Sequence, residues 1–151
     1  MIKIRMARVI SIEIITALFV LLWFYTGLNK ILDYNNFKSQ LEKSPFVEYF
    51  ASLISWTLPA GEVFIGAMLV YKRTRLLGLY ASFTLMLFLT GYIWMMLRYA
   101  YDLPCSCGGV LAQLSWDDHL WFNSVFVLLS VIAIIFETET LFIPKRKEVV
   151  F

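Results

Sequence analysis

Long apolar segments alternate with shorter polar stretches along the whole chain. The apolar segments are four in number and span residues 9–28, 53–71, 76–97 and 120–136. Each is close to the roughly 20 apolar residues that an α-helix needs to cross the hydrocarbon core of a bilayer. A chain that crosses lipid must satisfy its backbone hydrogen bonds internally, which helices do. The pattern therefore predicts an all-α integral membrane protein, folded as a single membrane domain with a four-helix bundle.

The polar stretches carry signals of their own. In residues 29–52, Phe37 and Leu41 are four positions apart, which places them on one face of a helix. Ser44 followed by Pro45 fits a helix N-cap and first helical position. We therefore expect short amphipathic helices at the membrane surface between the first two spans. The alternative is an ordinary ordered loop.

A capping box marks the start of the fourth apolar segment. Ser115 precedes Asp118 by three positions, so that each side chain can pair with the backbone N–H of the other residue. This spacing predicts a helix that begins just after Ser115.

Composition supports the membrane assignment and excludes several other classes. The chain has 151 residues, of which 60% are hydrophobic and 16% charged, and its mean hydropathy is +0.73. Soluble domains are nearer a quarter charged. The net charge of +2 gives no reason to expect a nucleic-acid partner. Two cysteines are too few for a disulfide scaffold, and with one histidine they fall short of the four ligands of a structural zinc site. No metal site is predicted.

Basic residues are divided unequally between the two sides of the predicted bundle. One side holds nine of them: Lys3, Arg5, Arg8, Lys72, Arg73, Arg75, Lys145, Arg146 and Lys147. The other side holds four: Lys30, Lys38, Lys43 and Arg98. By the positive-inside rule the first side is cytoplasmic. We therefore expect a multi-pass protein of the bacterial inner membrane with both termini in the cytoplasm and residues 98–113 in the periplasm.

The predicted periplasmic segment contains the only two cysteines of the chain, Cys105 and Cys107. Pro104 precedes them and two glycines follow, which predicts a tight loop. A Cys-x-Cys disulfide closes a small ring, and departures from ideal geometry make such a bond more reducible. Labile disulfides are typical of catalytic or regulatory sites, and the periplasm is a compartment where disulfides persist. The leading interpretation is thiol–disulfide exchange, with both cysteines as the catalytic groups of an oxidoreductase. The alternative is a non-enzymatic scaffold or accessory subunit of a larger export or assembly complex.

Further side chains are candidates for tuning a proton or a thiolate. Glu62 is an ionisable group at membrane depth, where function is the default hypothesis; the alternative is a polar tie between helices, and in either case we expect it to face the bundle interior. His119 lies in the first turn of the fourth span and could shuttle protons or lower the pKa of a thiol, or simply lie at the interface. Arg98 ends the third span. It could stabilise a thiolate or a quinone oxygen, or snorkel to the membrane surface.

Several stretches of this sequence together carry a family resemblance: Tyr25–Lys30, Phe37, Leu58–Glu62 and Cys105–Gly109. With them the chain resembles the MauE/DoxX family of redox-associated membrane proteins. The resemblance implies a four-helix membrane bundle that works with a periplasmic thioredoxin-like protein or a disulfide-containing client. The architecture is also similar to that of DsbB and vitamin K epoxide reductase, which makes a quinone a candidate cofactor. Those enzymes carry two cysteine pairs and this chain has one, which argues against a self-contained pathway from thiol to quinone.

Overall fold

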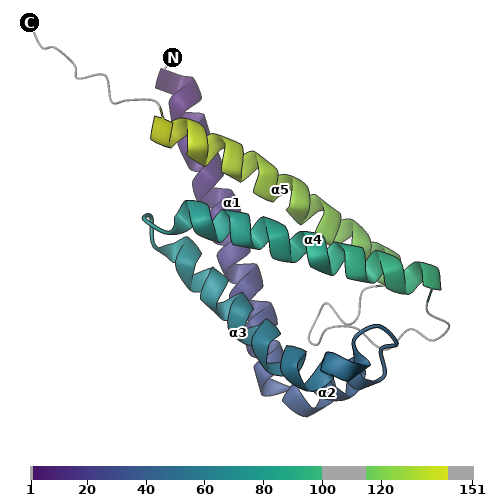
Figure 1. Ribbon diagram of the computed structural model, residues 1–151. Coiled ribbons are helices and arrows are strands. Elements are labelled where there is room, and N and C mark those ends of the chain that lie inside the picture. The colour runs from purple at the N-terminus through teal and green to yellow at the C-terminus, as the bar shows by residue number, and fades with distance from the viewer. Residues whose placement is uncertain (1, 100–114, 143–151) are drawn as a thin grey trace, which may run out of the picture.

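A computed structural model of the protein describes residues 2–99 and 115–142 (Figure 1). Within these ranges the chain is helical and contains no strand. The elements in chain order are α1 (Ile2–Leu32), α2 (Tyr34–Glu42), the 3₁₀-helix η1 (Glu48–Phe50), α3 (Ala51–Val70), α4 (Arg75–Tyr99) and α5 (Trp116–Phe142). Among them α1, α3, α4 and α5 are long and apolar enough to cross a membrane. The predicted all-α membrane bundle is therefore confirmed.

The long helices bring the start of α1, the end of α5 and the α3–α4 turn to one end of the bundle (Figure 1). There Arg8 of α1 pairs with Glu139 of α5 at 2.7 Å. Arg75, the first residue of α4, donates to both carboxylate oxygens of Glu13 of α1, at 2.8 and 3.3 Å. We call this end the termini end. The opposite end, which carries α2, η1, the end of α4 and the start of α5, is the loop end.

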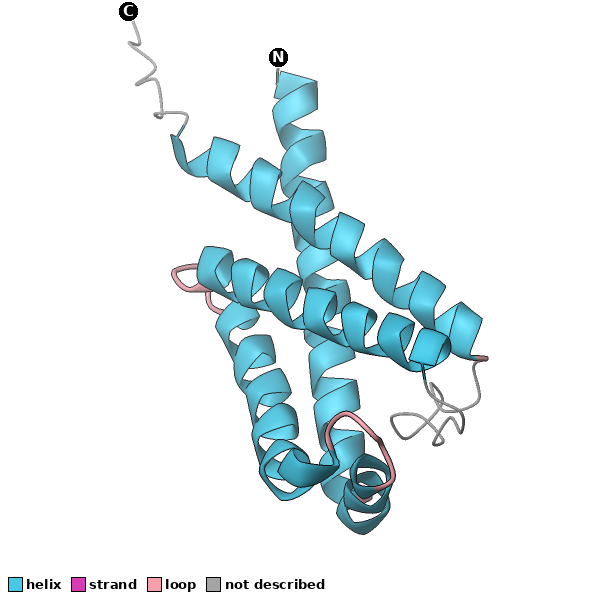
Figure 2. Cartoon of the chain, turned by 45° about the vertical axis from the view of Figure 1, so that its right-hand side comes forward, coloured by secondary structure: helices cyan, strands magenta, loops and turns pink. Residues whose placement is uncertain are grey.

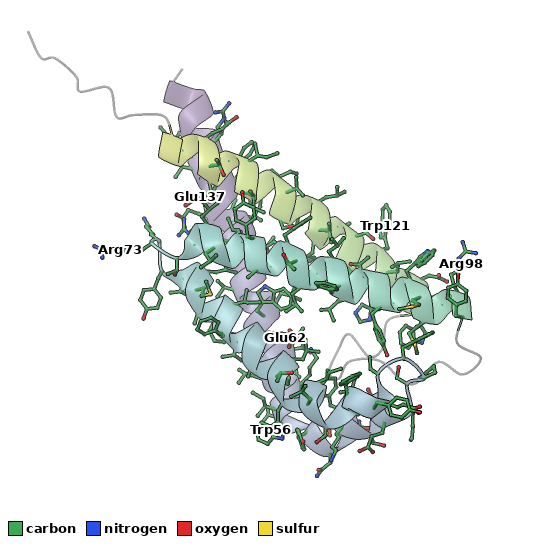
Figure 3. The ribbon with its side chains drawn as sticks, in the orientation of Figure 1. Trp56, Glu62, Arg73, Arg98, Trp121 and Glu137 are labelled. Carbon is green, nitrogen blue, oxygen red and sulfur yellow. The ribbon has the colours of Figure 1, made fainter. Side chains whose placement is uncertain are left out.

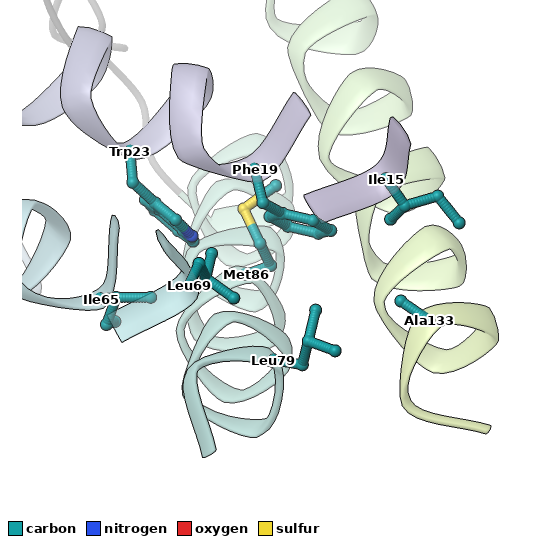
Figure 4. Packing of buried hydrophobic residues seen from close by; sticks show 8 residues of the cluster. All are labelled: Ile15, Phe19, Trp23, Ile65, Leu69, Leu79, Met86 and Ala133. Carbon is teal, nitrogen blue, oxygen red and sulfur yellow. The ribbon is translucent and has the colours of Figure 1, made fainter. Parts of the chain in front are cut away.

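The core is formed by side chains from all of the long helices (Figure 4). Its buried members are Ile15, Phe19, Trp23, Ile65, Leu69, Leu79, Met86 and Ala133. Helices in lipid are held by close packing and interhelical hydrogen bonds rather than by exclusion of water. Both occur here, because the Trp23 indole N–H donates to Ser82 Oγ at 2.9 Å and the ring of Phe19 meets that of Phe126 edge-on at 5.2 Å.

α3 and α4 leave their shared turn and diverge toward the loop end (Figures 1 and 2). The amphipathic α2 packs against α1 and α3 at that end. As its position on the predicted face requires, Phe37 of α2 is buried, with 6% of its surface exposed. The expected short helices between the first two spans are therefore present, and they bring an aromatic side chain into the interior.

The two predicted helix starts have different outcomes. Ser115 caps α5 as expected: its Oγ accepts the Asp118 backbone N–H at 3.2 Å and donates to the Asp118 carboxylate at 2.6 Å. The predicted α-helix start at Ser44–Pro45 is wrong, because a turn and then η1 follow. The Ser44 side chain is buried instead, with its Oγ 2.5 Å from the Tyr92 hydroxyl of α4. The hydroxyl that could cap a helix is used to tie the turn to α4.

Candidate functional site

An apolar cavity of about 380 Å³ lies inside the bundle at its loop end. Its walls come from α1, α2, α3, α4 and α5, with Val47 from the turn before η1. The volume falls within the range of about 300–1,000 Å³ that is usual for small-molecule sites, which combine apolar walls with a few polar groups. The polar or ionisable side chains in this wall are those of Thr26, Lys30, Glu62, Tyr92, His119 and Asn123. We call it the loop-end cavity and take it as the candidate site.

A buried ion pair crosses the wall of the cavity between α1 and α3. Lys30 Nζ lies 2.7 Å from Glu62 Oε1 and 2.9 Å from Oε2, and the two side chains are only 4% and 1% exposed. Figure 3 marks Glu62 on α3. The expectation that Glu62 faces the interior is confirmed. Its contact with Lys30 fits the alternative in which Glu62 links two helices by a polar interaction. Each charge compensates the other, which is what makes either one tolerable at this depth.

Close contact between α1 and α3 sets the ion pair in place. A Cβ added at Gly27 would come within 2.9 Å of a methyl carbon of Val63 and 3.2 Å of the Pro59 carbonyl oxygen. Gly27 precedes Lys30 by three residues, as Pro59 precedes Glu62, so each pair shares a helix face. The missing side chain at Gly27 therefore lets the two backbones approach where the ion pair forms.

His119 enters the cavity wall from the first turn of α5. It is only 5% exposed, and its Nδ1 has no hydrogen-bond partner among the described residues. Asn123, one turn further along α5, is equally buried and also lines the cavity. His119 is therefore a buried part of the cavity wall rather than an exposed side chain. The capping box fixes where α5 begins, and the packing of α5 turns position 119 inward.

Arg98 lies apart from this site. Its side chain is at the loop end of α4 and points away from the bundle (Figure 3), with the guanidinium carbon 6.0 Å from the ring centre of Trp94. It is not part of the cavity wall. The structure therefore brings together two of the three tuning candidates, Glu62 and His119, and leaves Arg98 on the surface, as the snorkelling interpretation expects.

Cys105 and Cys107 lie outside the described residues. The segment that contains them leaves α4 after Tyr99 and reaches α5 at Trp116, and both of those helix ends are at the loop end (Figure 2). Within the described ranges, no three His, Cys, Asp or Glu side chains cluster closely enough to hold a metal ion.

Lys30 is the main residue of the site that the sequence interpretation missed. It was counted as a basic residue outside the first span, which was expected to end at residue 28. α1 continues to Leu32, and within it the lysine charge is neutralised by Glu62. Two signals pointed to it: a carboxylate at membrane depth needs a partner, and Lys30 shares a helical face with Gly27.

Comparison with known proteins identifies a family. Residues 8–136 match the family model described as methylamine utilisation protein MauE. The matched range runs from the second turn of α1 through most of α5 and includes every residue of the cavity wall. No curated protein and no solved structure matches the chain.

Proposed function

We propose that this chain, which belongs to the MauE family of membrane proteins, exchanges thiols and disulfides with a periplasmic partner through Cys105 and Cys107. The partner would be a thioredoxin-like protein or a disulfide-containing client. The observation that carries the proposal is the placement in sequence of the only two cysteines, one residue apart, between Pro104 and a pair of glycines. In the chain these cysteines lie between α4 and α5, two helices long and apolar enough to cross a membrane, which supports a place for them outside the bilayer.

The exchange needs only the two sulfurs and the partner disulfide. A thiolate of the reduced pair attacks a partner sulfur, forms a mixed disulfide and expels the other partner sulfur as a thiolate. The second cysteine then attacks its neighbour in the mixed disulfide, which closes the Cys105–Cys107 bond and releases the partner as a dithiol. Two electrons and two protons pass to the partner. The reverse sequence oxidises the partner.

Among the tuning candidates, His119 is best suited to handle the protons of this exchange. Its buried Nδ1 has no partner among the described residues, so it is available to a proton. Glu62 is committed to Lys30, and Arg98 is directed toward the surface. We therefore assign proton transfer to His119 and a structural role to Glu62.

Trapping variants test the exchange directly. In Cys105→Ser the remaining Cys107, whose glycine neighbours give easier access, should accumulate a mixed disulfide with the partner, because no second thiol resolves it. Cys107→Ser should accumulate less. A reductant-sensitive adduct on a non-reducing gel, identified by mass spectrometry, is the measurement. The variant with both cysteines changed to serine is the control and should give no adduct. If neither single variant forms a mixed disulfide in cells, the cysteines do not exchange with a partner, and the alternative of a non-enzymatic scaffold is favoured.

We also propose that the cysteine segment faces the periplasm, and thiol labelling of the full chain tests this orientation. In intact cells treated with mild reductant, a membrane-impermeant maleimide should label the native cysteines. A matched control places one cysteine at Thr74, exposed in the α3–α4 turn, with both native cysteines changed to serine. That variant should be labelled only after the membrane is opened. Labelling of the Thr74 cysteine but not of the native cysteines in intact cells would show that the topology is reversed. The native cysteines would then not face an oxidising compartment, and the proposal would lose that support.

A further inference from the structure

A shallow groove on the surface of the bundle adjoins the loop-end cavity. It runs between α3 and α4, which diverge toward the loop end (Figure 1). Both helices are long and apolar enough to cross a membrane, so the groove faces the hydrocarbon of the bilayer. Four side chains line the groove and the cavity alike: Ile54, Leu58, Leu85 and Phe88. These side chains therefore form the boundary between the cavity and the lipid.

The groove is apolar even where its residues carry hydroxyl groups. Thr57 donates to the Leu53 carbonyl oxygen and Thr84 to the Tyr80 carbonyl oxygen, each at 2.9 Å, so both hydroxyls are satisfied within their own helices. Gly61 also lines the groove and leaves open space beside it, because a Cβ added there would meet nothing within 4 Å. A hydrocarbon chain can therefore lie in the groove without leaving a buried polar group unpaired.

The charges in the cavity wall exclude a charged occupant. Lys30 and Glu62 neutralise each other in a bidentate contact, and an ionised ligand group would have to compete with one of them for the other. Breaking a buried pair in this way is strongly unfavourable. The polar side chains of His119 and Asn123 belong to α5, which does not line the groove. The part of a ligand that enters between α3 and α4 must therefore be uncharged and apolar.

The boundary side chains favour a thin, flexible occupant over a rigid one. Ile54, Leu58 and Leu85 can change rotamer, so that a narrow path opens while the helices stay in place. A fused ring system would need α3 and α4, which are in contact, to separate. Once inside, a chain supplies contacts to wall atoms that lack neighbours on the cavity side, which stabilises the filled cavity over the empty one. A straight hydrocarbon chain that is already present in the bilayer meets these requirements.

We propose that the loop-end cavity holds the end of one acyl chain of a bilayer phospholipid. The chain enters between α3 and α4. Its headgroup stays at the membrane surface on the side of the loop end, because the two helices diverge toward that side (Figure 1). The bound chain is an apolar filler between α3, α4 and the rest of the bundle, and its binding is independent of the cysteine exchange.

Photolabelling of the full chain in phospholipid nanodiscs tests the site. A small fraction of the phosphatidylcholine carries a diazirine at the end of one acyl chain, and mass spectrometry locates the labelled residues after irradiation. Label is expected on Trp23, which lines the cavity and is only 1% exposed, so that lipid around the bundle does not touch it. Trp121, which is 73% exposed, reports labelling from the surrounding lipid. A sterol with the same photoreactive group should label Trp121 and not Trp23.

A matched pair of glycine variants tests entry through the groove. Gly61→Phe places a ring in the groove and should remove most of the label from Trp23 while leaving that on Trp121. Gly91→Phe makes the same change at an exposed position of α4 that also has open space for a Cβ but lines neither the groove nor the cavity. It should leave both labels unchanged. The variant without cysteines should be labelled like the natural chain, which separates this test from that of the exchange.

A further variant fills the cavity itself and keeps the test decisive where Gly61→Phe disturbs folding. Leu89 lines the cavity but not the groove, so Leu89→Trp should also remove most of the label from Trp23. A cooperative unfolding transition shows that each variant is folded. The proposal would be overturned by the absence of label on Trp23 in the natural chain, by equal Trp23 labelling in Gly61→Phe and Gly91→Phe, by a Leu89→Trp variant labelled like the natural chain, or by sterol labelling of Trp23.

Discussion

Replacing Glu62 with leucine should destabilise the bundle by about 3–5 kcal/mol, the usual effect of removing one partner from a buried ion pair. The change leaves the Lys30 ammonium, only 4% exposed at its side chain, without a counter-charge inside an apolar wall. Glu62→Gln should have a smaller effect, because the amide oxygen still accepts a hydrogen bond from Lys30. The free energy of unfolding, measured by denaturant titration in a fixed lipid–detergent mixture, gives both values.

The double variant Lys30→Met/Glu62→Leu separates a charge effect from a packing effect. Hydrophobic replacement of a whole buried pair is often neutral or stabilising, so the double variant should recover most of the stability lost in Glu62→Leu. The exposed pair between Lys38 and Glu42, at 3.8 Å, is the matched control, and Glu42→Leu should change stability by less than about 1 kcal/mol. If the double variant is no more stable than Glu62→Leu, the loss of stability comes from the packing of the side chains between α1 and α3 and not from the unpaired charge.

The helices of this protein were predictable from sequence because the membrane imposes a length on them. Apolar segments near the spanning length have few alternatives to a helix, and Ser115 fixed the start of α5 through local hydrogen bonds with Asp118. Ser44 followed by Pro45 was a similar local signal for a helix start, but the prediction was wrong. The Ser44 hydroxyl instead forms a hydrogen bond with the hydroxyl of Tyr92, which is distant in sequence. A local capping pattern therefore predicts a helix start correctly only where no residue distant in sequence competes for the hydrogen bonds of the capping side chain.

The candidate site was predictable only in part, because it depends on how the helices are paired and rotated. Glu62 could be found alone, since a carboxylate in an apolar span is conspicuous. Lys30 was harder to find, because its signals are indirect and a lysine at the end of a span is ordinarily a surface residue. The inward rotation of His119 was also hidden, since α5 is apolar on every side and shows no stripe that marks its buried face.

Three of the four stretches that carry the family resemblance meet in the structure, and the fourth, Cys105–Gly109, lies outside the described residues. Tyr25–Lys30 and Leu58–Glu62 are distant in sequence, yet they supply Gly27 and Pro59 to one close helix contact and Lys30 and Glu62 to one ion pair. Phe37, the isolated residue of the resemblance, has its ring centre 5.8 Å from Lys30 Nζ. These stretches therefore describe a single packed site rather than separate motifs.

The contact at Gly27 predicts the second large effect: Gly27→Ala should destabilise the bundle by about 1–3 kcal/mol, as overpacking of a close contact does. The added Cβ would lie 2.9 Å from a Val63 methyl carbon and 3.2 Å from the Pro59 carbonyl oxygen. The methyl group can rotate away, but the carbonyl belongs to the backbone of α3. The two helices must therefore separate, which also stretches the Lys30–Glu62 pair three residues further along α1.

Gly61→Ala is the control for this prediction, because it makes the same chemical change in the partner helix. A Cβ at Gly61 would meet nothing within 4 Å, and alanine is favoured over glycine within a helix by about 1 kcal/mol. This variant should therefore be neutral or slightly stabilising in the same unfolding titration. Adding Val63→Ala to Gly27→Ala should recover only part of the loss, since it relieves the methyl contact and leaves the carbonyl contact. Equal stability of the Gly27→Ala and Gly61→Ala proteins would mean that α1 and α3 are not held this closely, and the short Lys30–Glu62 distances would then need another cause.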